Sequence, residues 1–203
     1  RQLINLDGTP DKSRLGANAI LGVSLALAKA AAISKKIPLY RYIGGVSACA
    51  LPTPMMTIIK GGAHADNDLD FQEFMIMPVL ADSFADSVRS GAQIFHALKS
   101  LLKKKGHSTN VGDEGGFAPN LRNTKEALDL VLEASEAAGF SAGTEILIAL
   151  DAASSEFYKS GSYHLIGEGK KFNASEMIDF YKQLCAEYPC LLYTSDAADE
   201  WLR

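Results

Sequence analysis

Apolar residues follow two patterns along this chain, one with helical spacing and one continuous. Spacing of about 3.6 residues predicts helices over 13–34, 82–105 and 124–138 and from Asn173 to Glu187, with a short helical turn over 38–43. Continuous apolar runs predict strands over 52–59, 71–79 and 145–151, and Tyr188-Pro189 leads into a further strand. Residues Tyr158 to Leu165 predict a small hairpin that turns at Ser160-Gly161.

The ends of these helices carry recognisable capping residues. Asp11 or Ser13 is expected to cap the first long helix, and Asn123 with Glu126 is close to a capping box for the helix over 124–138. The helix over 82–105 should end at Gly106, after three lysines that suit the negative end of its dipole. Its apolar stripe is predicted to be Phe84, Val88, Ala92, Phe95, Leu98 and Leu102.

The first two predicted strands are joined by residues 60–70 only, with no helical pattern between them. Parallel neighbours need a crossover of roughly a dozen or more residues. We therefore expect these two strands to pair antiparallel. The element order is then strand, strand, helix, helix, strand, helix, strand, whereas simple alternation would indicate an ordinary barrel or a doubly wound sheet.

Composition narrows the class of protein. The 203 residues allow one or two domains, and a net charge of −4 without a basic block argues against nucleic acid as a main partner. No apolar run is expected to reach the roughly 18 or more residues of a membrane span, and no signal segment opens the chain. Three cysteines without zinc-like spacing favour a reduced, cytoplasmic protein. Because residue 1 is Arg, we expect an internal piece of a longer protein.

Candidate chemistry centres on Val111-Gly-Asp-Glu-Gly-Gly-Phe-Ala-Pro-Asn120, where Asp113 and Glu114 are held between glycines. Glycines permit backbone angles that side chains forbid and allow a ligand to approach closely. A solvated acidic turn is the alternative, because turns favour Gly, Asn and Asp. Three further polar clusters lie at expected strand ends: Gly61-Gly-Ala-His64-Ala-Asp-Asn67, Gln72-Glu73-Phe74, and Leu150-Asp151-Ala-Ala-Ser154-Ser155-Glu156.

These four clusters, together with Ser13-Arg-Leu-Gly-Ala-Asn-Ala-Ile-Leu-Gly-Val-Ser24, resemble the enolase family from about Asp7 to Pro189. The resemblance implies an α/β fold, namely the first part of an enolase-type TIM barrel with an antiparallel second strand. It also implies that the end of a smaller α+β domain precedes this barrel. The expected divisions are 1–47 for that domain, 48–189 for the barrel and 190–203 for a tail outside the family.

The resemblance also implies roles for single residues. Asp151 matches the first of three carboxylate ligands to a structural Mg²⁺, although Asp151 could equally cap the backbone that follows it. Glu114 matches the general acid and Glu73 its partner, since two nearby carboxylates cannot both ionise cheaply. His64, Gln72 and Glu73 would contact substrate, and Asp113 would support the loop. A surface-facing Glu73 and a loop histidine without a task remain the alternatives.

The sequence departs from the family in two places. Lys60 stands where the family has Asn, which blurs the loop that carries His64. Thr194 falls where a second Mg²⁺ ligand is expected, and residues 190–203 look like foreign sequence or a divergent tail. We assign structural or surface roles to His96, His107 and His164, and a turn-and-cap role to Ser154-Ser155-Glu156, which lacks the frame of a nucleophilic serine.

As a member of that family, the parent protein would dehydrate 2-phosphoglycerate to phosphoenolpyruvate in glycolysis, as a cytoplasmic, Mg²⁺-dependent homodimer. This chain would supply the acid side of the site, and we expect it to be inactive by itself because other ligands and the base are missing. Two alternatives remain: a non-catalytic binding protein that keeps part of the scaffold, and another magnesium enzyme of the same superfamily.

Overall fold

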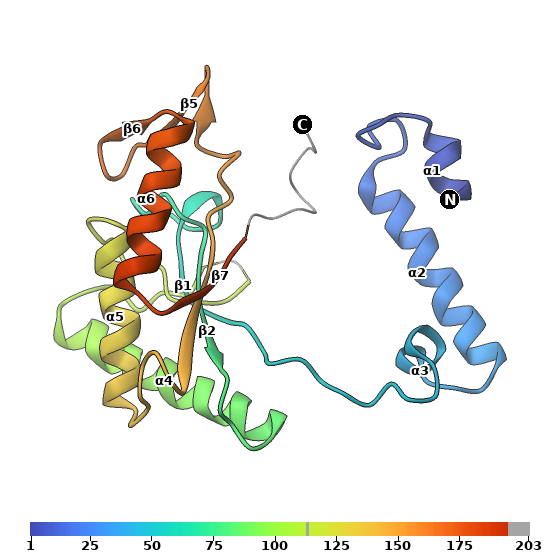
Figure 1. The fold of residues 1–203 in the computed structure, drawn as a ribbon, viewed down its shortest axis with the longest axis horizontal. Helices are drawn as coiled ribbons and strands as arrows, with labels where there is room; N and C mark the ends of the chain where they lie inside the picture. Colours follow the sequence, from blue (N-terminus) through green and yellow to red (C-terminus); the bar gives the residue numbers. More distant parts are fainter. Residues whose placement is uncertain (113, 195–203) are drawn as a thin grey trace. The chain divides into compact units, whose positions relative to one another are not determined.

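The computed structural model describes residues 1–112 and 114–194. Within them the chain divides into two compact units, one formed by residues 1–52 and the other beginning at Thr53. The first unit is helical, and the second combines a four-stranded sheet with helices and a small three-stranded sheet (Figure 1). The candidate chemistry lies in the second unit.

The first unit contains three helices, α1 (Gln2–Asp7), α2 (Ala17–Ser34) and α3 (Leu39–Gly44). The long helix is present as predicted, but the expected caps are wrong, because α2 begins later and its N-cap is Gly16. The cause is the carboxylate of Asp7, which accepts hydrogen bonds from the backbone of Thr9 (3.0 Å) and Leu15 (2.7 Å). These bonds hold the preceding residues in a loop instead of a first helical turn.

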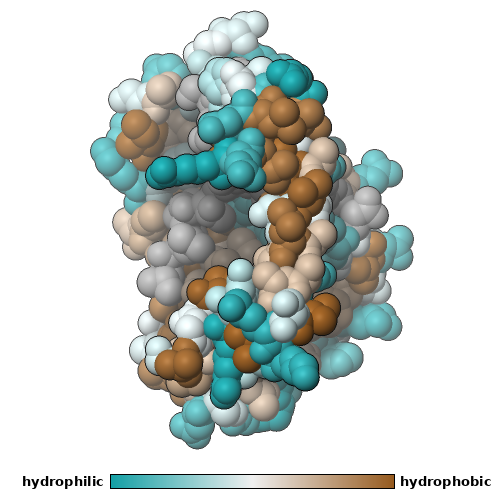
Figure 2. Space-filling model, turned by 90° about the vertical axis from the view of Figure 1, so that its right-hand side faces the viewer, coloured by the Kyte–Doolittle hydropathy of each residue, from teal (hydrophilic) through white to brown (hydrophobic). Residues whose placement is uncertain are grey.

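Helix α2 exposes much of its apolar surface. Leu21, Val23, Leu25, Leu27 and Ile33 are each about half or more exposed, and Figure 2 shows a band of apolar side chains on the face it views. With 18 residues and a mean hydropathy of 1.5, α2 is long and apolar enough to cross a membrane. This differs from the expectation from the sequence. Lys29 is the one charged residue of this helix. These two criteria are weak, since core helices and signal sequences of soluble proteins also meet them.

The main sheet of the second unit contains β1 (Met56–Lys60), β2 (Glu73–Pro78), β3 (Ile146–Asp151) and β7 (Cys190–Thr194), in the order β1-β2-β3-β7. The antiparallel pairing of β1 with β2 is confirmed. β2 is also antiparallel to β3, whereas β3 and β7 are parallel. β1 starts four residues later than predicted because Pro52 and Pro54 lack the N–H groups that a ladder needs.

One end of this sheet carries a row of residues in register. Lys60 pairs with Glu73, Glu73 with Asp151, and Asp151 with Thr194. Because β2 runs opposite to the other three strands, the row joins the start of β2 to the carboxyl ends of β1, β3 and β7. Directly paired residues share a face of the sheet. The fold therefore brings together positions that lie far apart in the sequence.

Two helices, α4 (Phe84–Lys104) and α5 (Thr124–Ala137), pack together and against the sheet. The buried side of α4 was only partly predicted: Leu98 and Leu102 are buried, but Phe84 and Val88 are 43% and 45% exposed. Ser87, Ser90 and Gly91 face inward in their place. Small residues allow the close approach, since a Cβ on Gly91 would lie 2.5 Å from Sδ of Met56.

The remaining elements are η1 (Gly62–His64), the small sheet of β4 (Tyr158–Lys159), β5 (Ser162–Leu165) and β6 (Lys170–Phe172), and α6 (Ala174–Glu187). The predicted hairpin at Ser160-Gly161 is confirmed, and β6 extends it to a third strand. α6 begins with a full capping box, in which Asn173 and Glu176 bond each other's backbone. Helices and sheet enclose one apolar core.

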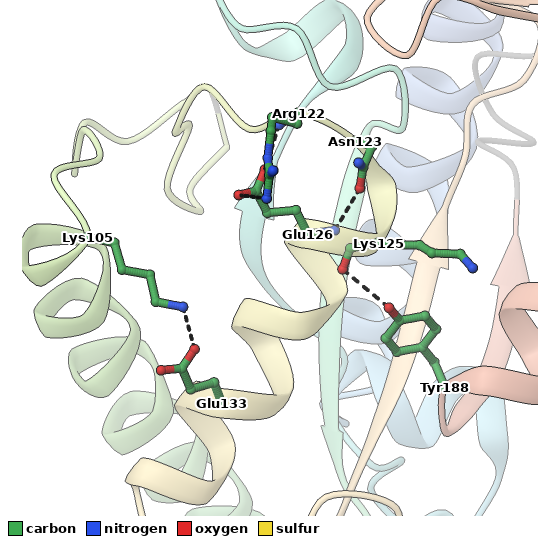
Figure 3. Close-up of polar contacts among 7 residues, drawn as sticks. All are labelled: Lys105, Arg122, Asn123, Lys125, Glu126, Glu133 and Tyr188. Atoms are coloured by element: carbon green, nitrogen blue, oxygen red, sulfur yellow. Dashed lines mark hydrogen bonds and ion pairs between the residues drawn. The ribbon is translucent and has the colours of Figure 1, made fainter.

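Side-chain contacts fix α5 relative to its neighbours (Figure 3). The side chain of Asn123 accepts from the backbone of Glu126 (2.9 Å), which confirms the predicted cap. Lys105 forms an ion pair with Glu133 (2.6 Å), and the Tyr188 hydroxyl donates to the backbone carbonyl of Lys125 (3.4 Å). The described part of the second unit is thus an α/β fold whose four-stranded sheet starts a barrel and does not close.

Candidate functional site

The carboxylate of Glu73 lies at the start of β2 and is bonded from the neighbouring strand. Thr57 Oγ1 donates to Glu73 Oε2 (3.0 Å), and Lys60 Nζ donates to Glu73 Oε1. The side chain of Glu73 is 19% exposed. It is therefore not the surface-facing residue of the alternative interpretation, but a largely buried carboxyl group with a partner on each oxygen.

Glu114 reaches the same place from the glycine-framed loop. Glu114, Gly115 and Gly116 all have positive φ (65°, 98° and 77°), which reverses the chain within a few residues. The returning end is bonded to β1, since Phe117 N donates to Ile58 O (2.9 Å) and Phe117 O accepts from the backbone of Lys60 (2.8 Å). The loop thus presents Glu114, whose side chain is 65% exposed, over the end of the sheet. Asp113, expected to support this loop, lies outside the described residues.

Lys60 connects these two glutamates. Its side chain has no exposed surface, and its ammonium donates to Glu73 and to Glu114 Oε2 (3.0 Å). Burial acts to lower the pKa of Lys60, but the hydrogen bonds and charges of both glutamates outweigh burial and raise that pKa above its ordinary value. Both glutamates therefore accept from one ammonium, and that cation lies between their carboxyl groups.

Asp151 ends β3 and is 4% exposed. Its Oδ1 accepts from the backbone of Ala153 (3.1 Å), so the turn-capping alternative is realised for one oxygen. Mg²⁺ prefers six oxygen ligands in an octahedron. Within residues 1–112 and 114–194 there is no group of three or more Asp, Glu, His or Cys that could hold a metal. These residues therefore offer one carboxylate of the expected type and do not complete a magnesium site.

The connection between β1 and β2 is held by backbone and amide contacts. Gly61 N donates to the carbonyl of Gln72 (2.9 Å), and Gln72 N donates to the carbonyl of Asp151 (3.2 Å). Asn67 Nδ2 donates to the carbonyls of Lys60 (2.9 Å) and Pro119 (3.0 Å), which joins this connection to the end of the glycine loop. Gln72 is buried, and His64 lies in η1 within the same connection.

A pocket of about 420 Å³ lies beside this connection and the loops around the small sheet, where Asn67, Asp68, Glu156, Lys159 and His164 contribute to its lining. Asp70 joins the connection between β1 and β2 to the turn between β5 and β6, because its carboxylate accepts from the backbone of Gly167 (3.1 Å) and Glu168 (3.2 Å). Burial raises the pKa of Asp70. Lys60, Glu73 and Glu114 are not among the residues that line this pocket.

The remaining histidines lie where the sequence analysis placed them. His96 is on the exposed side of α4, and His107 follows that helix. His164 lies in β5, where its Nε2 is 2.9 Å from the hydroxyl oxygen of Ser162. What sequence reasoning missed is the part played by Lys60, which it treated as a departure that blurs a loop. The signal was available, because a lysine that ends an apolar strand one short connection before Glu73 can pair with it across an antiparallel ladder.

Two family models match this chain. The model described as enolase, N-terminal domain, matches residues 1–43. The model described as enolase, C-terminal TIM barrel domain, matches residues 48–201, a range that includes the glutamate pair, Asp151 and β7. The second match alone covers more than half of the sequence. The N-terminal model matches within the first compact unit, and the barrel model matches the second. The chain therefore belongs to the enolase family.

Proposed function

We propose that the protein containing this sequence is a lyase that removes water from 2-phosphoglycerate to give phosphoenolpyruvate, with Glu73 and Glu114 on the acid side of its site. One observation carries this proposal: two glutamates from separate elements converge at the end of the sheet where β1 and β3 finish, in a chain of the enolase family. In α/β barrels the carboxyl ends of the strands form the active-site face.

Departing hydroxide needs a proton, and a positioned carboxyl group is a suitable donor. Glu114 is the exposed member of the pair and can approach a ligand, while Glu73 lies behind it and is fixed by Thr57. Gln72 and His64 belong to the adjoining connection and are proposed substrate contacts. Asp151 is the proposed ligand for magnesium in the complete site, and no step is assigned to the metal because the described residues do not complete its coordination.

The test compares two reactions in the product of the full reading frame that contains this sequence. Formation of the enol product measures dehydration, and exchange of the α-proton with solvent deuterium measures proton removal. We expect both activities in the unaltered protein, and Glu114→Gln should reduce dehydration more than exchange because it leaves the base side intact. Glu133→Gln, which removes an exposed carboxylate paired with Lys105, is the matched control and should change neither rate. Equal losses in both reactions would remove Glu114 from the acid role.

Absence of both reactions in the unaltered protein would favour a second candidate, a non-catalytic protein that retains the scaffold. Two observations favour that candidate. Lys60 occupies the space between the glutamates, and Thr194 is the register neighbour of Asp151 at the end of β7. A cytoplasmic location and assembly as a homodimer are proposed on the family resemblance alone.

A further inference from the structure

Two asparagine side chains join the connection between β1 and β2 to the glycine loop. Asn67, in that connection, donates from Nδ2 to the carbonyl of Pro119 (3.0 Å), at the returning end of the loop. Asn120, the next residue of the loop, accepts through Oδ1 from the backbone N–H of Asp68 (3.2 Å). The partners in each bond are 52 positions apart in the sequence. Neighbouring residues of the two segments thus bond each other in both directions.

Asn67 is also anchored to the main sheet. The same Nδ2 donates to the carbonyl of Lys60 (2.9 Å), the last residue of β1, and Oδ1 accepts from the backbone N–H of Leu69 (3.3 Å). Because two partners are carbonyls and one is an N–H, only one orientation of the amide satisfies all three. Pro119 is buried, so water is a poor replacement for the donor that its carbonyl receives from Asn67.

We propose that Asn67 is a positioning residue, whose amide holds the returning end of the glycine loop at the end of β1 and so sets where Glu114 meets Glu73. Pro119 follows Glu114 by only five residues, so a shift of the loop end is carried to the glutamate. The ion pair with Lys60 is a weaker restraint, because the side chain of Glu114 is 65% exposed and water competes for it.

The catalytic consequence rests on the proposed function, whereas the attachment of the loop does not. A general acid acts only when its proton is within hydrogen-bond reach of the group that receives it. Displacement of the loop therefore weakens Glu114 as the donor to departing hydroxide. Asn67 acts through the loop and is assigned no contact with the substrate.

Asn67→Asp is the decisive variant, because aspartate keeps the size of the side chain and the acceptor for Leu69 but has no N–H for the two carbonyls. Asn120→Asp is the matched control, since it makes the same change of charge in the facing segment and keeps an oxygen that can accept from Asp68.

Backbone hydrogen exchange in the 203-residue chain, followed residue by residue by nuclear magnetic resonance, measures the attachment of the loop without any enzymatic activity. The reporters are the amides of Lys60 and Phe117, because Lys60 N donates to Phe117 O (2.8 Å) and Phe117 N to Ile58 O (2.9 Å). Amides inside α4 are the reference for overall stability, since that helix takes no part in these bonds.

We expect Asn67→Asp to accelerate exchange at Lys60 and Phe117 by on the order of 10-fold, the scale of lost hydrogen bonds to buried groups, with α4 unchanged. Asn120→Asp should leave these rates unchanged. Equal acceleration in α4 would overturn the proposal, because Asn67 would then serve overall stability alone. Unchanged exchange at the reporters, or the same acceleration in Asn120→Asp, would also overturn it.

If Asn67→Asp does not fold, Asn67→Ala removes the same donors without adding a charge, and the same amides decide. Failure of both variants to fold assigns Asn67 to overall stability and overturns the proposal.

The catalytic consequence is measured in the product of the full reading frame. Asn67→Asp should slow dehydration by on the order of 10-fold or more, the effect of a misplaced catalytic group. Added to Glu114→Gln, it should cause little further loss, because the group that it displaces is already absent. The same fold-loss with and without Glu114 would overturn this consequence. If the unaltered protein catalyses neither reaction, the proposed function fails, and the hydrogen-exchange rates still decide whether Asn67 holds the loop.

Discussion

The three linked side chains should contribute very unequally to stability, because their exposure differs. Replacing Glu73 by Met leaves the ammonium of Lys60 fully buried with one carboxylate fewer. Breaking a buried pair by removing one partner costs about 3–5 kcal/mol where the remaining charge is left uncompensated. Lys60 has no exposed surface through which it could regain water, but it keeps its bond to Glu114. We therefore expect Glu73→Met to cost about 3 kcal/mol, the lower end of this range.

Lys60→Met should cost less, about 2 kcal/mol, the scale of a buried group that loses one hydrogen-bond partner. In that variant the carboxylate of Glu73 loses the hydrogen bond from Lys60, but it is 19% exposed and still accepts from the hydroxyl of Thr57. Glu114→Met should cost about 1 kcal/mol or less, because a side chain that is 65% exposed is screened by water. The expected order of destabilisation is Glu73→Met, then Lys60→Met, then Glu114→Met.

The double variant Lys60→Met/Glu73→Met distinguishes an ion pair from two independent packing losses. Replacing both members of a buried pair by apolar residues of similar size is often neutral. The double variant should therefore be more stable than Glu73→Met alone, with a coupling free energy of about 2 kcal/mol or more. Urea unfolding at neutral pH, followed by circular dichroism, supplies the free energies. Lys105→Met, which removes an exposed partner of Glu133, should stay within about 0.5 kcal/mol. Additive losses in the double variant would refute the reasoning.

Three further outcomes are expected. Glu73 and Glu114 raise the folded-state pKa of Lys60 above 10.5, so the stabilisation from this lysine is complete below pH 10.5 and is lost as the pH rises through the higher folded value. The free energies of unfolding of the unaltered chain and of Lys60→Met, measured in urea, should therefore converge at alkaline pH. A constant difference between them would contradict this. Gly167→Ala should destabilise the second unit, since a Cβ there would overlap the carbonyl of Asp68, whereas Gly169→Ala, with open space, should cost less by urea unfolding. In the product of the full reading frame, Glu114→Gln should slow dehydration by on the order of 10²-fold, because it removes a positioned proton donor; an unchanged rate would contradict this.

Much of this architecture could be read from the sequence because local signals and tertiary packing agree. The antiparallel start followed from the length of one connection, and the cap at Asn123 followed from a side chain that bonds the nearest free N–H group. The same local reasoning was wrong at the start of α2. There the decisive bonds come from Asp7, eight residues before Leu15, and a capping pattern considers only immediate neighbours.

The inward face of α4 was mispredicted for a related reason. Spacing alone assigned Phe84 and Val88 to the core, but the helix approaches the sheet through Ser87, Ser90 and Gly91. A hydrophobic stripe indicates which residues gain from burial, whereas close approach is decided by which residues are small enough. Which residues of α4 face inward depends on Met56, which lies in β1 and contacts the helix at Gly91. The residue pattern of α4 alone contains no information about that contact.

The candidate site shows the same limit at the level of charge. Glycines and carboxylates indicated that Glu114 should meet Glu73, and the fold brings both to the end of the sheet. What the pattern did not give was the net charge of the meeting point, because that depends on the register that sets Lys60 opposite Glu73. The same register sets Glu73 opposite Asp151, so charged side chains from three neighbouring strands meet at one end of the sheet. Their meeting depends on strand pairing, which no single stretch of the sequence contains.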